Sequence, residues 1–242
     1  MLLSELSKPN SFKLEYHDAL STKIWDVDTL KSEVYDALKK ISIEFIKTLE
    51  IDNSAITDVI ITGSLCNYNY TKYSDIDLHI VVDYELLCDD CEGFSISDCM
   101  NAKKALWNER HDITIYGLDV ELYVQSVNDP ITGNAGVYSL RKKAWLKRPV
   151  KETAIEYDEK MIVSKAKYIM FEIDDIIENK VSDSESIDKL KEKIRNMRKS
   201  GLERGGEYSL ENLVFKMLRN NGYLDLLNDY KIEKKNTELS LK

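Results

Sequence analysis

Apolar residues recur with two different periods along the chain, and each period predicts a different type of element. From residue 28 to 49 they return every three or four positions, which predicts an amphipathic helix with Asp28 as its N-cap. Residues 57–62 form a short apolar run that ends at Gly63, which predicts a buried strand. The first elements are therefore a helix followed by a strand.

The next segment, residues 75–82, alternates strictly between the two faces of a predicted strand. Ile76, Leu78 and Ile80 share one face, while Asp75, Asp77 and His79 share the other. A helical pattern follows at residues 97–110. Residues 113–125 then alternate as a strand that is broken at Gly117.

The pattern changes after Pro149, where strand-like alternation ends and long helical patterns begin. They cover residues 152–180, 185–200 and 209–235, and Gly222 interrupts the last one. We therefore predict an α+β fold with two domains. Residues 1–150 would form a mixed sheet with flanking helices, and residues 151–242 an all-helical C-terminal domain.

Charge is distributed unevenly over these two parts. The chain has 242 residues, 43% of them hydrophobic, and a net charge of −9. Residues 1–150 carry −8 of that charge. An acidic protein is a poor candidate for coating nucleic acid, because nonspecific binding depends on many Lys and Arg contacts to phosphates.

The sequence offers no apolar run long enough for a membrane span and no secretory signal at its start. We therefore expect a cytoplasmic protein without a membrane partner. The pair Cys88 and Cys91 lacks a second Cys or His pair at zinc-site spacing, so reduced thiols are expected.

Candidate chemistry centres on Gly63-Ser64 and on Asp75-x-Asp77, which follows after ten intervening residues. A strand that ends in Gly-Ser offers backbone N–H groups and a hydroxyl to phosphate oxygens. Two aspartates at positions i and i+2 of a strand share a face, and such close like charges favour bound divalent cations. Each feature alone is common on solvated surfaces, but the combination is specific.

A third acid on a neighbouring strand would complete a metal cage. Asp119 and Glu121 both lie on the polar face of the strand predicted at residues 113–125. We favour Glu121 because the residues around it alternate more regularly, and Asp119 remains the alternative.

The stretch from Gly63-Ser64 to Asp75-Ile76-Asp77-Leu78 resembles the signature of the DNA polymerase β-type nucleotidyltransferase superfamily, which includes small phage and bacterial members. The resemblance covers about residues 55–125. It implies a mixed sheet with flanking helices and a helical C-terminal subdomain.

The resemblance also implies site roles. Asp75, Asp77 and the third carboxylate would coordinate two Mg²⁺ or Mn²⁺ ions, and Gly63 and Ser64 would hold the β- and γ-phosphates of an NTP. The reaction would transfer NMP to a hydroxyl and release pyrophosphate. The acceptor stays open between RNA such as a tRNA end, a small molecule and a protein side chain.

Further residues are secondary candidates for nucleotide binding. Ser74 and Lys72 precede the aspartates, and His79 shares their face, although each is also typical of a solvated or packed position. Residues 139–151 form a basic run without acids, in which a triphosphate or RNA could bind or which could simply connect the domains. The candidates within and beside this run are Lys142, Lys143 and Tyr138, and Tyr138 could either stack on a base or pack in the core.

Two other functions compete with transfer. The first is a regulatory or antitoxin-like nucleotide-binding module of the same fold, which the intact pair of aspartates disfavours. The second is a phosphodiesterase or nuclease with the same metal cage, which His79 keeps open.

Overall fold

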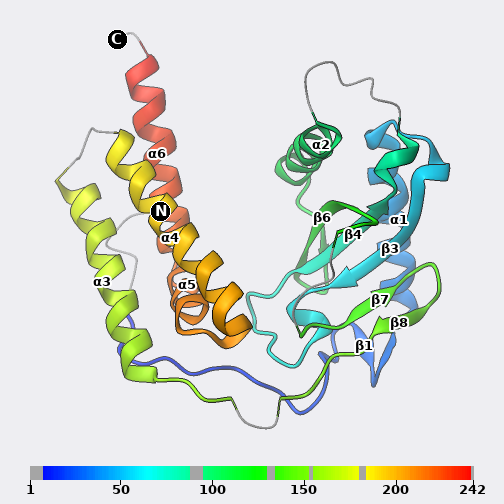
Figure 1. Ribbon diagram of the computed structural model, residues 1–242, viewed down its shortest axis with the longest axis horizontal. Coiled ribbons are helices and arrows are strands. Elements are labelled where there is room, and N and C mark those ends of the chain that lie inside the picture. The colour runs from blue at the N-terminus through cyan, green and yellow to red at the C-terminus, as the bar shows by residue number, and fades with distance from the viewer. Residues whose placement is uncertain (1–7, 88–94, 130–133, 153–154, 180–183, 241–242) are drawn as a thin grey trace. The chain divides into compact units, whose positions relative to one another are not determined.

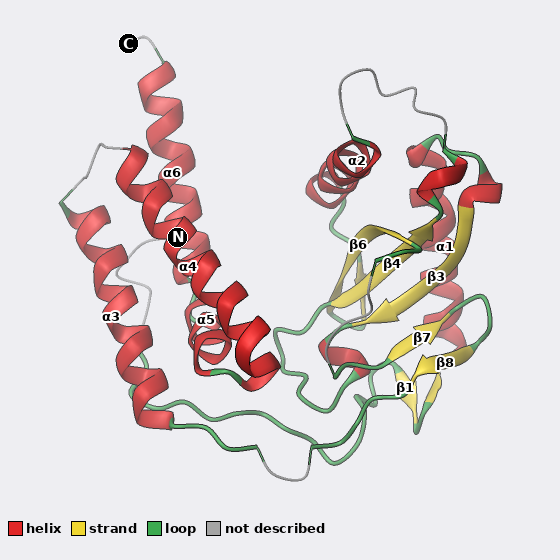
Figure 2. Ribbon diagram, in the orientation of Figure 1, coloured by secondary structure: helices red, strands yellow, loops and turns green. Residues whose placement is uncertain are grey.

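The chain divides into two compact units in the computed structural model, which describes residues 8–87, 95–129, 134–152, 155–179 and 184–240. The sheet unit is Glu15–Lys151, and the helical unit combines Met1–Leu14 with Glu152–Lys242. The strands of the chain lie in the sheet unit, whereas α3 to α6 belong to the helical unit (Figures 1 and 2).

The sheet unit is built on six strands in the order β5-β6-β4-β3-β7-β8. Their bounds are β3 Ile56–Thr62, β4 Ile76–Val82, β5 Thr114–Ile115, β6 Leu118–Ser126, β7 Val137–Ser139 and β8 Ala144–Lys147. β4 and β6 pair in parallel, while the other neighbouring strands are antiparallel. The prediction of a mixed sheet followed by C-terminal helices is confirmed.

Two helices, α1 (Ser32–Leu49) and α2 (Ile96–Arg110), pack against this sheet. Val34, Leu38 and Phe45 of α1 are fully buried in one core with the apolar residues of β4. The β4 residues of this core include the alternating row Ile76, Leu78 and Ile80, each at most 1% exposed. Because side chains alternate along a strand, burying this row turns the intervening polar residues of β4 to the opposite face.

The predicted N-cap at Asp28 is wrong. Residues Trp25–Asp26 and Thr29–Leu30 form a two-stranded hairpin, β1 and β2, and Asp28 lies in its turn. The helix starts after Lys31, which makes no side-chain cap. The hairpin buries Trp25, whose ring stacks on Trp145 at 4.6 Å between centroids, so long-range packing overrides the local helical pattern.

The break predicted at Gly117 is a tight hairpin turn between β5 and β6. Tyr116 and Gly117 both have positive φ angles, 53° and 72°. Two consecutive residues with positive φ form a type I′ turn, the two-residue hairpin turn whose twist matches that of the flanking strands.

The helical unit contains α3 (Glu159–Glu178), α4 (Ser184–Gly205), α5 (Leu210–Asn220) and α6 (Tyr223–Leu239). The pattern predicted at residues 209–235 is thus two helices, which Gly222 separates in the left-handed conformation at φ 75°. Phe12 and Leu14 pack against the core of this unit, a placement that the sequence did not indicate.

The described helices include no candidate membrane span, because none combines the necessary length with enough apolar character. The cytoplasmic location stays a prediction. Cys88 and Cys91 lie outside the described residues.

We expect Leu78→Ala to destabilise the protein by about 2–5 kcal/mol, because it leaves a cavity in the middle of the sheet core. Leu78 is fully buried. Leu86→Ala is the matched control, since Leu86 is 56% exposed and its truncation should cost less than about 0.5 kcal/mol. Chemical denaturation of both variants measures the difference, and equal losses would contradict this placement of the core.

Candidate active site

Three carboxylates meet on the polar face of the sheet. Asp75 immediately precedes β4, Asp77 lies within it, and Glu121 lies on β6. One ligand oxygen from each lies within 4.8 Å of the others, and all three residues are half-buried. Among the described residues, this is the group of three acidic, His or Cys side chains that could hold a metal ion.

Strand pairing explains why these residues meet. Asp77 is in register with Glu121 across the parallel pair of β4 and β6, so their side chains share a face. Asp119 also lies on β6, but it is exposed, pairs with Thr114 of β5 and is outside the group. The structure therefore places Glu121, and not Asp119, beside the two aspartates.

The donor set fits a hard divalent cation. Three carboxylates at this separation repel one another, and a cation between them relieves the repulsion. Oxygen donors of this kind are the preferred ligands of Mg²⁺, Mn²⁺ and Ca²⁺. Asp75, Asp77 and Glu121 are thus chemically suited to the metal that the sequence predicts.

Gly63 borders the triad directly. It follows the last residue of β3, Thr62, which is in register with Asp77. Its φ is +80°, and a Cβ at this position would lie 1.9 Å from Asp77 Oδ2. Only glycine allows this backbone conformation while leaving the carboxylate in place.

Ser64 and Ser74 close the excursion that leads from β3 to Asp75. Ser64 begins a 3₁₀ turn, Ser64–Cys66, and its hydroxyl donates to Ser74 Oγ at 2.8 Å. Ser74 is buried, and its Oγ also accepts a hydrogen bond from the Thr71 N–H at 2.9 Å. Two serines that the sequence singled out therefore hold the loop beside the triad.

A second layer of side chains supports Glu121. The Tyr123 hydroxyl donates to Glu121 Oε2 at 2.5 Å, and its ring stacks on His79 at 4.6 Å between centroids. His79 Nδ1 lies 2.6 Å from Gln125 Oε1. Burial and the bond to Glu121 raise the pKa of the Tyr123 hydroxyl, so it remains a donor at neutral pH.

Sequence reasoning missed Tyr123 and Gln125. The signal was present, because both follow Glu121 at steps of two and therefore share its face. His79 belongs to this layer, and burial lowers the pKa of its ring. The ring contacts the neighbouring side chains of Tyr123 and Gln125, which favours a packing role.

The remaining loop candidate, Lys72, is exposed in the excursion. Its ammonium lies 4.7 Å from the centroid of the Tyr73 ring. Nothing in this contact directs it toward the triad, and its role in nucleotide binding stays a prediction.

Tyr138 is a core residue, which is the alternative weighed against base stacking. It is 3% exposed, and its ring packs edge-on against Trp25 and Trp145, with centroids 5.2 and 5.4 Å away. These rings leave it no free face for a nucleotide base.

Lys142 and Lys143 lie away from the triad, and their role in nucleotide binding stays a prediction. They are in the turn between β7 and β8, and the adjacent Arg141 donates to the carbonyls of Ile56 and Thr57, where β3 begins. The turn follows Ser139, which pairs with Ile60, and it extends toward the start of β3, whereas Thr62 at the other end of β3 is in register with Asp77.

The rest of the basic run is also engaged in structural contacts of the sheet unit. Arg148 pairs with Asp28 at 2.5 Å, and Lys151 pairs with Asp18 at 2.6 Å. The Lys143 ammonium lies 4.3 Å from the centroid of the Tyr35 ring. These contacts attach the run to the sheet unit, and its role in nucleotide or RNA binding stays a prediction.

No protein-family model matches the sequence, and no curated protein matches it. Among solved structures, the STING-associated CdnE c-di-GMP synthase from Capnocytophaga granulosa is similar over 88% of this chain and 84% of its own, at 14% identity and a TM-score of 0.21. Two folds that superpose so poorly do not support a shared function, so the functional interpretation rests on the residues of this chain.

We expect Gly63→Ala to weaken divalent-cation binding, because the new methyl group displaces the Asp77 carboxylate. Both Gly63 and Gly117 have positive φ, so an alanine at either position is strained by about 1–3 kcal/mol. Of these two glycines, only Gly63 has a neighbouring atom within 4 Å of the added Cβ. Gly117→Ala is therefore the control for backbone strain alone.

The measurement is the rise in melting temperature as Mn²⁺ is added to each variant. Gly117→Ala should melt at a lower temperature than the wild type without Mn²⁺, but Mn²⁺ should raise its melting temperature by as much as in the wild type. In Gly63→Ala, most of this Mn²⁺-dependent increase should be lost. An equal Mn²⁺ response in both variants would argue against this contact.

Tyr123→Phe should reduce divalent-cation affinity by about 10- to 100-fold, since it removes the hydrogen bond that orients Glu121. Tyr116→Phe is the matched control, because it removes a hydroxyl that bonds Glu33, which lies outside the triad. Calorimetric titration with Mn²⁺ reports both affinities, and unchanged binding in Tyr123→Phe would show that Glu121 needs no such support.

Proposed function

We propose that the protein is a metal-dependent nucleotidyltransferase, which transfers NMP from an NTP to a hydroxyl acceptor and releases pyrophosphate. One observation carries the proposal. Asp75, Asp77 and Glu121 converge on adjacent parallel strands, with Gly63 in contact range of Asp77. The sequence around these residues resembles the nucleotidyltransferase signature, and the geometry supports that interpretation.

In this proposal the sheet unit carries the chemistry. Asp75, Asp77 and Glu121 would hold one or two divalent cations, Mg²⁺ or Mn²⁺. A bound cation would stabilise the charge that develops on the entering and leaving oxygens of an in-line displacement. Backbone N–H groups at Gly63 and the Ser64 hydroxyl would hold the outer phosphates of the NTP.

The bond changes follow from this arrangement. The acceptor oxygen forms a bond to the α-phosphorus, the bond from the α-phosphorus to the bridging oxygen breaks, and pyrophosphate leaves with that oxygen. The acceptor hydroxyl loses its proton in the process, and Glu121 would promote this loss. Tyr123 would hold Glu121 in position for that task.

The three carboxylates of the triad help to distinguish an enzyme from a binding module. They lie on the sheet face opposite the α1-covered core, and three like charges side by side destabilise a protein that binds no cation. A nucleotide-binding module without catalysis would need phosphate-binding groups but no such cage. The triad therefore favours an enzyme over a regulatory module.

We expect incubation with each labelled NTP and Mg²⁺ to release pyrophosphate and to label an acceptor in total RNA, small-molecule or protein fractions. Asp77→Asn should reduce pyrophosphate release and acceptor labelling by more than about 100-fold. Mutating even a residue that only supports a metal ligand typically costs about 10- to 100-fold in activity. Asp119→Asn on the same face of the sheet should retain activity, because Asp119 is exposed and outside the triad.

Two results would contradict the proposal. Mg²⁺-dependent NTP binding without pyrophosphate release from any NTP would indicate a binding module. Equal activity in Asp77→Asn and the wild type would show that the triad is not the reacting centre.

A further inference from the structure

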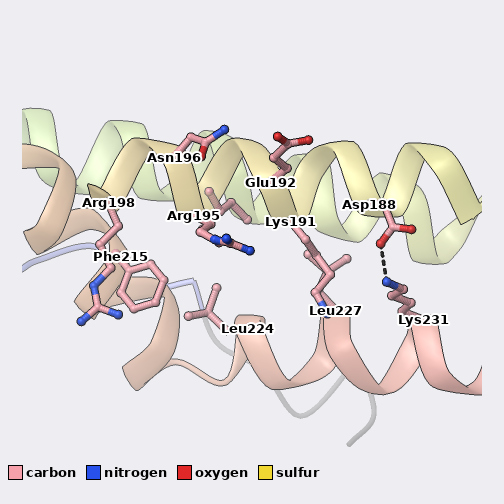
Figure 3. A pocket seen from close by; sticks show the side chains of 11 residues that line it. Asp188, Lys191, Glu192, Arg195, Asn196, Arg198, Phe215, Leu224, Leu227 and Lys231 are labelled. Atoms are coloured by element: carbon pink, nitrogen blue, oxygen red, sulfur yellow. Dashed lines mark ion pairs between the residues drawn. The ribbon is translucent and has the colours of Figure 1, made fainter. Parts of the chain in front are cut away.

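A groove between three helices of the helical unit has the properties of a second binding site. Its volume is about 680 Å³, and it is lined by residues of α4, α5 and α6 (Figure 3). This volume lies within the range of ligand sites. All the lining residues belong to one compact unit, so the site is defined without reference to the triad.

One wall of the groove is a row of cations. Lys191, Arg195 and Arg198 follow each other on α4 at steps of four and three, so they share one face of the helix. The row is about 10 Å long at 1.5 Å per residue, which is longer than a single phosphate group requires. Figure 3 shows Lys191 and Arg195 extending from α4 toward α6, whereas Glu192 projects from the opposite side of α4.

Part of this positive charge has no ion-pair partner among the described residues. Lys231 forms an ion pair with Asp188 at one end of the groove, so these two charges offset each other. Lys191 donates to Asn228 Oδ1 at 2.7 Å, which is an uncharged partner. Arg195 makes no ion pair with any of the described residues. Lys191 and Arg195 therefore have no ion-pair partner among the described residues and can meet an anionic ligand.

The groove also has an apolar part. Ile194 and Leu227 line it, but they are only 3% and 1% exposed because they belong to the core of the unit. Leu224 and Phe215 also line the groove, and both are half-buried, so their side chains supply its exposed apolar surface.

A flat surface lies at the other end of the groove. The Arg198 guanidinium is 4.3 Å from the centroid of the half-buried Phe215 ring. Aromatic rings and guanidinium planes are the groups on which unpaired bases stack. A row of cations beside a stacking surface matches the backbone phosphates and bases of one nucleic-acid strand.

We propose that the groove between α4, α5 and α6 binds a short single-stranded nucleic acid. The phosphates contact Lys191 and Arg195, and a base stacks on the Arg198 guanidinium, which itself lies over the Phe215 ring. This binding is independent of the metal chemistry proposed for the triad, because none of these residues belongs to the sheet unit.

The test measures fluorescence anisotropy of labelled oligo-U and oligo-dT of about eight nucleotides with the whole protein. EDTA is present, so cations at the triad make no contribution and the result does not depend on the proposed function. Arg195→Glu should weaken binding by roughly tenfold, and the slope of log K against log salt should become shallower by about 0.7 for each phosphate that the variant no longer binds. The oligonucleotide that binds more tightly identifies the preferred sugar.

Lys189→Glu is the matched control. It makes the same change in net charge on the same helix, but Lys189 pairs with Glu185 and does not line the groove. Lys189→Glu should leave the oligonucleotide affinity within about twofold of the wild type. Losing the exposed pair with Glu185 should also change the stability of the fold little. Thermal unfolding confirms that both variants are folded, and Arg195→Gln replaces the first variant if Arg195→Glu is unfolded.

Three results would overturn the proposal. The first is an equal effect of the two variants, or no effect of either. The second is loss of binding in Lys142→Ala instead, which would assign the nucleic acid to the sheet unit. The third is displacement by poly-glutamate as effective as displacement by the unlabelled oligonucleotide, which would indicate a site for acidic peptides.

Discussion

The parallel pairing of β4 with β6 is the constraint on which the site depends. The apolar row of β4 is buried against α1, and this burial fixes the face on which Asp75 and Asp77 lie. The register with β6 then sets Glu121 beside them. A slip of one residue would bury the carboxylates and expose the apolar row, so the same hydrophobic packing that stabilises the sheet also assembles the triad.

The elements with a clear period could be predicted from the sequence, and those decided by distant contacts could not. Alternation at residues 75–82 and helical spacing from Val34 to Leu49 match β4 and α1 closely. The hairpin before α1 did not follow from its local pattern, because it depends on Trp25 packing against Trp145. Likewise, local helical spacing gave no indication that Phe12 and Leu14 join the helical unit.

The site shows the same division between local and long-range information. Asp75, Asp77 and Gly63 were predictable because strand periodicity and the Gly-Ser turn are local signals. The choice between Asp119 and Glu121 required the register of β4 and β6, which depends on two segments far apart in the chain. The role of Lys142 and Lys143 stayed open between binding and connecting, because a basic run does not reveal at which end of a strand it lies.

The central claim is that Asp75, Asp77 and Glu121 together hold a divalent cation. Anomalous scattering from crystals of the protein soaked in Mn²⁺ tests it most directly. The account predicts an anomalous peak bonded to carboxylate oxygens of all three residues, at distances of about 2.0–2.3 Å. A well-ordered triad without a peak, while Mn²⁺ is bound elsewhere in the same crystal, would contradict it.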